Sequence, residues 1–141
     1  MDLELKDRVA IVTGGGMGIG KDIARLLSQE GCKVVICARR MSYLNEAAKE
    51  ISTETGSEVL PLFCDTTDMK AVQFMVDQAM QHFGRIDILV NGAAAPSGVV
   101  RNDIEHAEDH ELLGDLDTKV IGYFRCIKAV TPHMKRAGFG R

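Results

Sequence analysis

The residues best placed to do chemistry are a cluster of glycines near the N-terminus, in the run Thr13-Gly14-Gly15-Gly16-Met17-Gly18-Ile19-Gly20. An apolar run, Arg8–Thr13, precedes these glycines and an amphipathic run, Gly18–Glu30, follows, which predicts a strand, a loop and a helix. Glycines permit positive φ angles and close approach of the backbone to a ligand. The first turn of a helix offers free N–H groups and the positive end of its dipole to an anion. The pattern predicts a nucleotide phosphate site, although a glycine-rich turn without a ligand would show the same residues.

Two other phosphate-binding patterns fit this loop poorly. No register of the GxGxxG pattern places all three glycines. The P-loop pattern GxxxxGK[ST] is nearly matched by Gly15, Gly20 and Lys21, but Asp22 stands where a hydroxyl would contact magnesium. Because a carboxylate there would lie close to the phosphates, an ATPase or GTPase is disfavoured.

The rest of the chain alternates short apolar runs with longer amphipathic ones. The expected strands are Arg8–Thr13, Lys33–Ala38, Glu58–Phe63 and Ile86–Asn91. The expected helices are Gly18–Glu30, Ser42–Thr55 with Ser42 as its N-cap, and Asp68–Phe83, with glycines at 31, 56 and 84 as their stops. Strands separated by helices of this length predict a parallel α/β sheet. The strands are continuously apolar, which predicts helices on both faces of the sheet.

A further long helix is expected over roughly Glu105–Arg136. Its apolar residues recur at steps of three and four or their sums, which predicts one buried face, made of Leu112, Leu116, Val120, Phe124, Ile127 and Met134. His106 and His110 stand four apart near its start, but Ala107 and Asp109 break the metal-binding patterns HExxH and HxxEH. No metal site is therefore expected.

Composition favours a soluble single-domain protein. The chain has 141 residues, of which 45% are hydrophobic and 26% charged, and its net charge of −3 comes without a long basic run, so nucleic acid is a poor candidate partner. Residues 1–8 contain no apolar signal segment, and no apolar run reaches membrane-spanning length, so we expect a cytoplasmic protein without membrane contact. The four cysteines form no CxxC pair and are expected to be small buried side chains.

The spacing TGxxxGxG resembles the cofactor motif of the short-chain dehydrogenases/reductases. Asp65, just past the third expected strand, stands where this family holds adenine, and Asn91-Gly92-Ala93-Ala94 is similar to the family's NNAG motif, with Gly92 and Ala94 as departures. Asp117, Gly122 and Phe124 also fall as they do in the family's next helix. The resemblance covers essentially the whole chain. It implies a Rossmann-like doubly wound parallel sheet with strand order 3-2-1-4 and a cofactor of the NAD(P) type.

The resemblance also implies which residues contact the cofactor. These are Thr13, Gly14, Gly16, Met17, Gly18, Ile19 and Gly20 at the pyrophosphate, Arg39 and Arg40 at the adenosine ribose, Asp65 and Thr66 at adenine, and Asn91, Gly92 and Ala93 along the other ribose. After the second strand comes Ala38-Arg39-Arg40, without an acidic residue; guanidinium groups suit a 2′-phosphate, so NADP is favoured over NAD. Met17 weighs the other way, because many NADP-preferring relatives carry Lys or Arg there.

The implied reaction is hydride transfer between the nicotinamide cofactor and a carbonyl/alcohol or enone substrate. The family uses a Ser and a YxxxK pair, but Tyr43 and Tyr123 are followed four residues on by Ala47 and Ile127. The family's Ser and YxxxK lie beyond the strand that would follow this sequence. We therefore expect residues 1–141 to be a single NAD(P)-binding Rossmann domain, incomplete at its C-terminus, that binds cofactor without turnover.

One catalytic candidate and several alternatives remain. Lys119 falls at the position of a helix Asn that the family uses in a water chain, but a lysine on a solvated helix face is an equal interpretation. A second chain could supply the missing strands. Alternatively, the protein could be a non-catalytic nucleotide-binding or interaction protein derived from this fold. The resemblance implies a small-molecule substrate, which the sequence does not identify, and a homo-oligomer.

Overall fold

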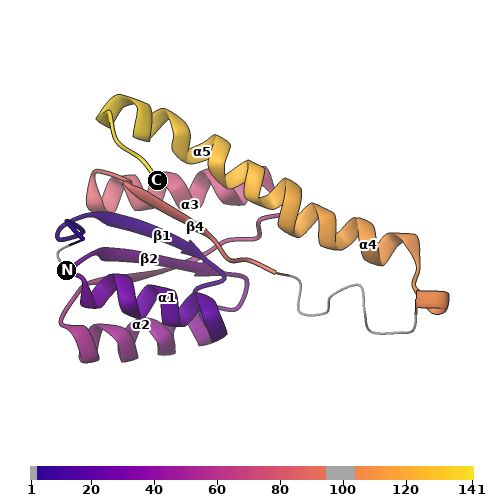
Figure 1. The fold of residues 1–141 in the computed structure, drawn as a ribbon, viewed down its shortest axis with the longest axis horizontal. Coiled ribbons are helices and arrows are strands. Elements are labelled where there is room, and N and C mark those ends of the chain that lie inside the picture. Colours follow the sequence, from indigo (N-terminus) through magenta and orange to yellow (C-terminus); the bar gives the residue numbers. More distant parts are fainter. Residues whose placement is uncertain (1–2, 95–103) are drawn as a thin grey trace.

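Four parallel strands form one sheet at the centre of the molecule (Figure 1). The computed structural model describes residues 3–94 and 104–141. The strands are β1 (Val9–Thr13), β2 (Lys33–Ala38), β3 (Val59–Phe63) and β4 (Ile88–Asn91), in the order β3-β2-β1-β4. The predicted parallel sheet and its strand order 3-2-1-4 are confirmed, with β4 starting two residues later than expected.

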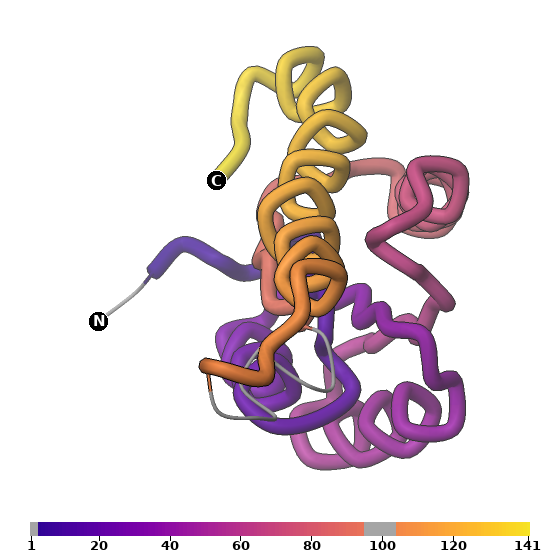
Figure 2. The backbone as a smooth tube through the Cα atoms, turned by 90° about the vertical axis from the view of Figure 1, so that its right-hand side faces the viewer, coloured from indigo at the N-terminus to yellow at the C-terminus, as the bar shows by residue number. Residues whose placement is uncertain are grey.

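Helices cover both faces of this sheet, as Figures 1 and 2 show from two directions. They are α1 (Gly18–Gln29), α2 (Met41–Thr55), α3 (Met69–Phe83), the 3₁₀ turn η1 (Ile104–His106), α4 (Asp109–Leu116), the π-helical segment η2 (Asp117–Ile121) and α5 (Gly122–Ala137). One hydrophobic core lies between the sheet and α1 with α2, and the other lies between the sheet and α3 with α5. Within the described part of the chain, no helix combines the length and apolar character needed to cross a membrane.

The two cores explain why the strands are apolar without interruption. Successive side chains of a strand point to opposite faces, so Ile11 enters the core beneath α3 and α5 while Val12 enters the core beneath α1 and α2. Val35 and Ile36 of β2 divide in the same way. The prediction of helices on both faces is confirmed.

The start of α2 differs from the sequence prediction. The helix begins at Met41, with Arg40 at the N-cap, and no side chain accepts a hydrogen bond there. The predicted Ser42 cap is wrong because the chain turns into the helix directly after β2, which places Ser42 inside the first turn. By contrast, Asp68 caps α3 by accepting from the Lys70 amide at 2.9 Å. The predicted stop of α2 is confirmed, since Gly56 adopts a left-handed φ of 71°.

The predicted helix over residues 105–136 is also partly wrong. It is divided into η1, α4, η2 and α5, and its predicted buried face is largely solvent-exposed. The exposed members are Leu112, Leu116, Val120, Phe124 and Ile127, between 43% and 61% accessible. The face of α5 that packs on the sheet carries Gly122, Cys126, Ala129 and Val130 instead. Residues two positions apart on a helix differ by about 200°, so Phe124 lies opposite to Gly122 and Cys126.

At the amino ends of the strands, Asp87 is a buried carboxylate with several partners. Its side chain is 1% exposed and accepts from Arg8 Nη1 at 3.1 Å, from Arg85 Nη2 at 2.6 Å and from the Val9 amide at 2.9 Å. On the edge of β4, the Arg141 amide donates to the Asp87 carbonyl at 3.0 Å and the Leu89 amide donates to the Arg141 carbonyl at 2.9 Å. These two bonds make a single parallel bridge beside β4.

Candidate functional site

The glycine loop brings the carboxyl ends of three strands together. Gly14 follows β1 with a φ of 71°, and its amide donates to the Cys37 carbonyl of β2 at 2.8 Å. A Cβ on Gly14 would lie 2.6 Å from the carbonyl oxygen of Gly92, which follows β4. A side chain at position 14 would therefore both strain the backbone and separate β1 from β4.

Thr13 fixes the same junction from inside. Its side chain is fully buried, and Oγ1 accepts hydrogen bonds from the amides of Gly92 at 3.0 Å and Ala93 at 3.1 Å. The hydroxyl thus holds the chain that leaves β4 against the end of β1. Thr13 therefore fixes the start of the glycine loop, which carries the residues predicted to contact the pyrophosphate.

Helix α1 begins against this loop with an open N-terminus. Met17 stands at the N-cap in an extended conformation, no side chain caps the helix, and the first turn contains no acidic residue. Gly18 has a φ of 54°, and a Cβ on Gly20 would collide with the Gly14 carbonyl. The N–H groups of a helix's first turn have no partner within the helix. Uncapped, they can receive an anion at the mouth of the glycine loop.

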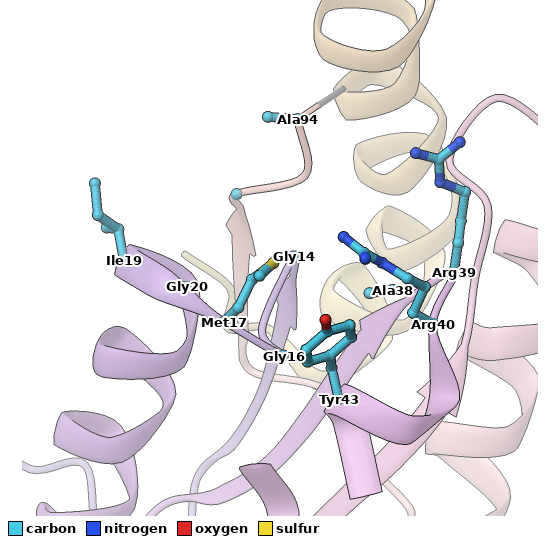
Figure 3. A pocket seen from close by; sticks show the side chains of 11 residues that line it. Gly14, Gly16, Met17, Ile19, Gly20, Ala38, Arg39, Arg40, Tyr43 and Ala94 are labelled. Carbon is cyan, nitrogen blue, oxygen red and sulfur yellow. The ribbon is translucent and has the colours of Figure 1, made fainter. Parts of the chain in front are cut away.

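A cavity of about 600 Å³ lies in front of this N-terminus (Figure 3). From the predicted contacts it gathers Gly14, Gly16, Met17, Ile19, Gly20, Arg39, Arg40 and Gly92. It also includes Ala38, Tyr43 and Ala94, which the sequence analysis did not assign to a site. Ligand pockets usually measure about 300–1,000 Å³, so this cavity has the size of a small-molecule site.

The two arginines after β2 stand at one wall of that cavity. Both are exposed, and the Arg40 guanidinium carbon lies 4.7 Å from the centroid of the Tyr43 ring. Figure 3 shows Arg40 reaching over the ring of Tyr43 beside the cavity. This cation–π contact restrains the Arg40 side chain where it faces the ligand space.

A smaller cavity of about 70 Å³ adjoins the first, and both share Gly14, Ala38, Arg39 and Ala94. It contains the predicted residues Asp65, Thr66 and Ala93, together with Cys37, Cys64 and Thr118. The structure thus places the predicted adenine and pyrophosphate residues around adjoining spaces.

Asp65 is held as a carboxylate in this smaller cavity. Partial burial alone would raise its pKa, but hydrogen bonds from the Thr67 amide at 2.9 Å and hydroxyl at 2.8 Å oppose that effect. The positive charges of Arg39 and Arg125 also lower the pKa of Asp65, which therefore lies below its usual value.

The π-helical segment contributes one residue, Thr118, to the lining of the smaller cavity. Arg125 Nη1 donates to the Thr66 carbonyl at 3.0 Å, and Nη2 pairs with Asp117 at 2.8 Å, which ties this segment to the end of β3. A Cβ on Gly122 would lie 2.9 Å from Thr66 Oγ1, so the approach requires a glycine. Sequence analysis missed Thr118 and Arg125, because a one-residue change of helical phase leaves no clear sequence signal.

Two predicted residues line neither cavity. The side-chain oxygen of Asn91 is buried at the end of β4 without a hydrogen-bond partner in the described structure. Lys119 is exposed on η2 and is absent from the linings of both cavities. Asn91 therefore keeps a buried acceptor without a partner in the described structure, and Lys119 contributes to neither lining, although it directly follows Thr118 of the smaller cavity.

The two histidines weighed as metal ligands lie in different elements. His106 ends η1, whereas His110 belongs to α4, where its Nδ1 lies 3.0 Å from Glu108. Residues 3–94 and 104–141 contain no group of three or more His, Cys, Asp or Glu side chains arranged to hold a metal ion.

Known proteins resemble this chain in both sequence and fold. A family model described as short chain dehydrogenase matches residues 8–141. The peroxisomal 2,4-dienoyl-CoA reductase ((3E)-enoyl-CoA-producing) of Rattus norvegicus is 40% identical over 124 residues, which is 84% of this chain and 42% of the rat protein.

Two solved structures superpose closely on the chain. An NAD⁺-bound xylitol dehydrogenase matches with a TM-score of 0.90 and 29% identity, covering 98% of this chain and 52% of that one. The L-sorbose reductase from Gluconobacter frateurii, complexed with NADPH and L-sorbose, matches with a TM-score of 0.90 and 31% identity, covering 99% and 52%. The chain therefore spans about half the length of these two structures, and less than half of the rat protein.

Proposed function

The chain belongs to the short-chain dehydrogenase family, and from that premise we propose that it binds NADP(H), or NAD(H), for an oxidoreductase reaction. The observation that carries the proposal is the cradle at the carboxyl end of β1. There Gly14 touches the backbone after β4 and the uncapped N-terminus of α1 opens into the 600 Å³ cavity. Such a cradle suits a pyrophosphate, which needs backbone N–H donors and no intervening side chain.

The remaining residues fit the other parts of a dinucleotide. Asp65 and Thr66 would face adenine from the smaller cavity, and Gly92 and Ala93 would lie along the ribose next to the nicotinamide. Asn91 directly precedes these two residues and would approach the same ribose, where its side-chain oxygen has no partner in the described structure. Bound there, the nicotinamide would supply or accept a hydride, while this chain's own residues orient the cofactor.

For the choice of cofactor we propose NADP. Support comes from Arg39 and Arg40, two exposed guanidinium groups on the cavity wall after β2, where no acidic side chain is available to a 2′-hydroxyl. The two similar structures carry one cofactor each, NAD⁺ in the xylitol dehydrogenase and NADPH in the L-sorbose reductase. The family fold alone thus accommodates both, and the arginines carry the preference.

The proposed substrate class is a carbonyl/alcohol pair or an enone. Relatives named for a dienoyl-CoA, a polyol and a sugar share this fold, so the fold does not select among them. The sequence contains no YxxxK pair, and Lys119 is not among the residues that line the two cavities. We therefore propose that residues 1–141 bind the cofactor and do not by themselves complete the reaction; a catalytic role for Lys119 stays a prediction.

Calorimetric titration of the purified chain with NADP⁺, NAD⁺ and ATP in parallel tests the proposal. We expect NADP⁺ to bind more tightly than NAD⁺, with ATP weakest. Equal affinities for NADP⁺ and NAD⁺ would remove the preference, and a folded chain that binds neither would contradict the cofactor site. Circular dichroism of the same sample establishes whether the chain is folded.

The second candidate is a non-catalytic nucleotide-binding or interaction protein, which the exposed apolar side chains from Leu112 to Ile127 would suit. Reading the gene beyond codon 141 separates the two candidates. An in-frame apolar strand, a Ser and a YxxxK pair would favour the oxidoreductase, whereas a stop codon would favour the second candidate. Carbonyl reduction by the 141-residue chain alone would contradict the claim that it only binds cofactor.

We also propose that the protein forms a homo-oligomer through the exposed apolar face of α4 and α5. Apolar side chains gathered on one surface commonly mark an interface, and here Leu116, Val120 and Phe124 are 43%, 57% and 61% exposed. Light scattering should show a multimer that Phe124→Glu dissociates, whereas Lys49→Glu, at an exposed position of α2 on the other face of the sheet, should not. A wild-type monomer at all concentrations would refute it. The expected cytoplasmic location stays a prediction.

A further inference from the structure

The proposed cofactor role makes no use of a group of buried cysteines beside the smaller cavity. Cys37, Cys64 and Cys126 belong to the same hydrophobic core, and all three are free thiols. Cys37 and Cys64 also line the 70 Å³ cavity, together with Asp65 and Thr66. Both residues are therefore buried from bulk solvent and line a small internal space.

The backbone places this pair diagonally on one face of two neighbouring strands, because Cys37 is paired with Leu62, two residues before Cys64. Cys37 lies near the end of β2, and Cys64 is the first residue after β3; the two strands are paired in parallel up to Ala38 and Phe63. The Cys64 amide extends that pairing by donating to the Ala38 carbonyl at 3.0 Å. Both side chains enter the core beneath α3 and α5.

The pKa values of the two thiols are shifted in opposite directions. A hydrogen bond between them, together with burial, raises the pKa of Cys37 well above its usual value. The same hydrogen bond lowers the pKa of Cys64, against the opposing effects of burial and of Asp65. A thiolate is the reactive form of cysteine, and Cys64, which lines the cavity directly before Asp65, is the one of the two whose lower pKa favours that form.

The other two cysteines provide a contrast within the same chain. Burial raises the pKa of Cys126 to about 12 and also raises the pKa of Cys32. Neither Cys32 nor Cys126 lines either of the two cavities. Burial in the core alone therefore does not distinguish Cys37 and Cys64; the cavity and the mutual contact do.

We propose that Cys37 and Cys64 form a peroxide-sensitive thiol pair in the wall of the nucleotide site, and that a hydroperoxide oxidises them to a disulfide. The Cys64 sulfur attacks the peroxide, so that an S–O bond forms, the O–O bond breaks, and the departing oxygen takes a proton to leave as water or an alcohol. Cys37 then attacks the sulfenic acid, forming the S–S bond and releasing water. The thiol pair loses two electrons and the peroxide gains them.

The smaller cavity can admit a small oxidant, and a bound nucleotide would compete for the same space. A water molecule occupies about 30 Å³, so a space of about 70 Å³ admits hydrogen peroxide. A nucleotide whose adenine lies against Asp65 would fill the same space, because Asp65 follows Cys64 directly. This competition rests on the proposed cofactor site, whereas the oxidation itself does not.

The test treats the purified chain with hydrogen peroxide and analyses its peptides by mass spectrometry without reduction. We expect a linked peptide containing Cys37 and Cys64, two hydrogens lighter than the sum of its parts, while Cys32 and Cys126 keep free thiols. Cys37→Ala should lose the link and accumulate a sulfenic acid at Cys64 that dimedone traps. Cys64→Ala should lose both products, and Cys126→Ala, the matched control, should form the link normally.

Free thiols at both positions after peroxide treatment, or oxidation of Cys126 at the same rate, would overturn the thiol pair. Circular dichroism of each variant excludes loss of fold as the cause of a missing link. With NADP⁺ at ten times its dissociation constant, the oxidation rate should fall about tenfold by mass action. An unchanged rate with bound nucleotide would reject the competition alone. An absence of nucleotide binding would reject the cofactor site and leave the oxidation result to decide the pair.

Discussion

The buried polar side chains at the two ends of β4 differ in whether they have hydrogen-bond partners. Just before the strand, Asp87 is 1% exposed and its carboxylate is bonded to Arg8, Arg85 and the Val9 amide. At the other end, Asn91 has a buried side-chain oxygen without a partner, and helix α1 begins there without a side-chain cap. A buried polar group without a partner costs free energy. The amino end thus contributes stability, whereas at the carboxyl end Asn91 keeps a buried acceptor without a partner and the uncapped N–H groups of α1 stay open for a ligand.

The largest expected effect comes from removing the ion pairs of Asp87 at the amino end of β4. Asp87→Asn removes the charge that pairs with Arg8 and Arg85 and should lower the free energy of unfolding by about 3 kcal/mol, the low end of the range for a broken buried ion pair because both arginines reach solvent. Urea denaturation followed by circular dichroism measures this. Nucleotide affinity of the folded variant should not change; a large loss of affinity would contradict the separation of the two ends.

The next effect breaks the carboxyl end. Replacing both Arg39 and Arg40 by Ala should weaken NADP⁺ binding by about 2 kcal/mol, roughly 30-fold, because charge-assisted hydrogen bonds to a 2′-phosphate are lost. NAD⁺ binding should change little, and so should stability, since both side chains are exposed. Calorimetry with both nucleotides measures the difference. A parallel loss for NAD⁺ would assign the arginines to the pyrophosphate instead.

Acid should act on the amino end of β4. Burial alone would raise the pKa of Asp87, but the hydrogen bonds from Arg85, Val9 and Arg8 outweigh it, so the pKa lies below its usual value. A carboxylate with a depressed pKa contributes stability above its unfolded pKa of about 4, and loses that contribution as pH falls through its folded pKa.

The stability gap between the wild type and Asp87→Asn should therefore be constant above about pH 5 and shrink below about pH 4, by at most about 1.4 kcal/mol per pH unit. Urea midpoints measured across that range test the expectation. A gap that stays constant down to pH 2 would show that the charge of Asp87 is not the source of its contribution.

The smallest expected effect concerns Thr13, which should contribute both to stability and to nucleotide binding. Thr13→Val keeps the shape but removes the acceptor of the Gly92 and Ala93 amides, and should lower stability by about 1 kcal/mol. Unlike Asp87→Asn, it should also weaken nucleotide binding several-fold, since the chain after β4 borders both cavities. Calorimetry and urea denaturation on one preparation compare the two losses. A loss of stability without a loss of affinity would make Thr13 purely structural.

Local patterns made most of the sheet and the glycine loop predictable. Each strand is a short apolar run, and the spacing between Thr13 and Gly20 is a backbone requirement that glycines reveal directly. The gathering of Arg40, Asp65 and Gly92 around adjoining cavities follows from parallel topology, because the carboxyl ends of neighbouring strands meet at one edge.

The parts that sequence analysis missed depend on tertiary packing. The residues from Leu112 to Ile127 form an apolar stripe, but a stripe shows only that one face is apolar, not what covers it. The contact between Cys37 and Cys64 joins residues 27 positions apart on neighbouring strands, so no local spacing reveals it. Arg125 similarly acts through the carbonyl of Thr66, a backbone partner that sequence patterns do not show.

The π-helical segment η2 accommodates one extra residue between α4 and α5. Such a segment holds about one residue more per turn than an α-helix, so it takes up an extra residue without the rotation of about 100° that an insertion causes in a regular helix. Deleting one residue between Asp117 and Ile121 should therefore restore a regular helix and keep the orientation of α4 relative to α5. The deletion would remove the wider turn that brings Thr118 to the smaller cavity. At this point of the chain, a change of length by one residue would alter the nucleotide site more than most substitutions.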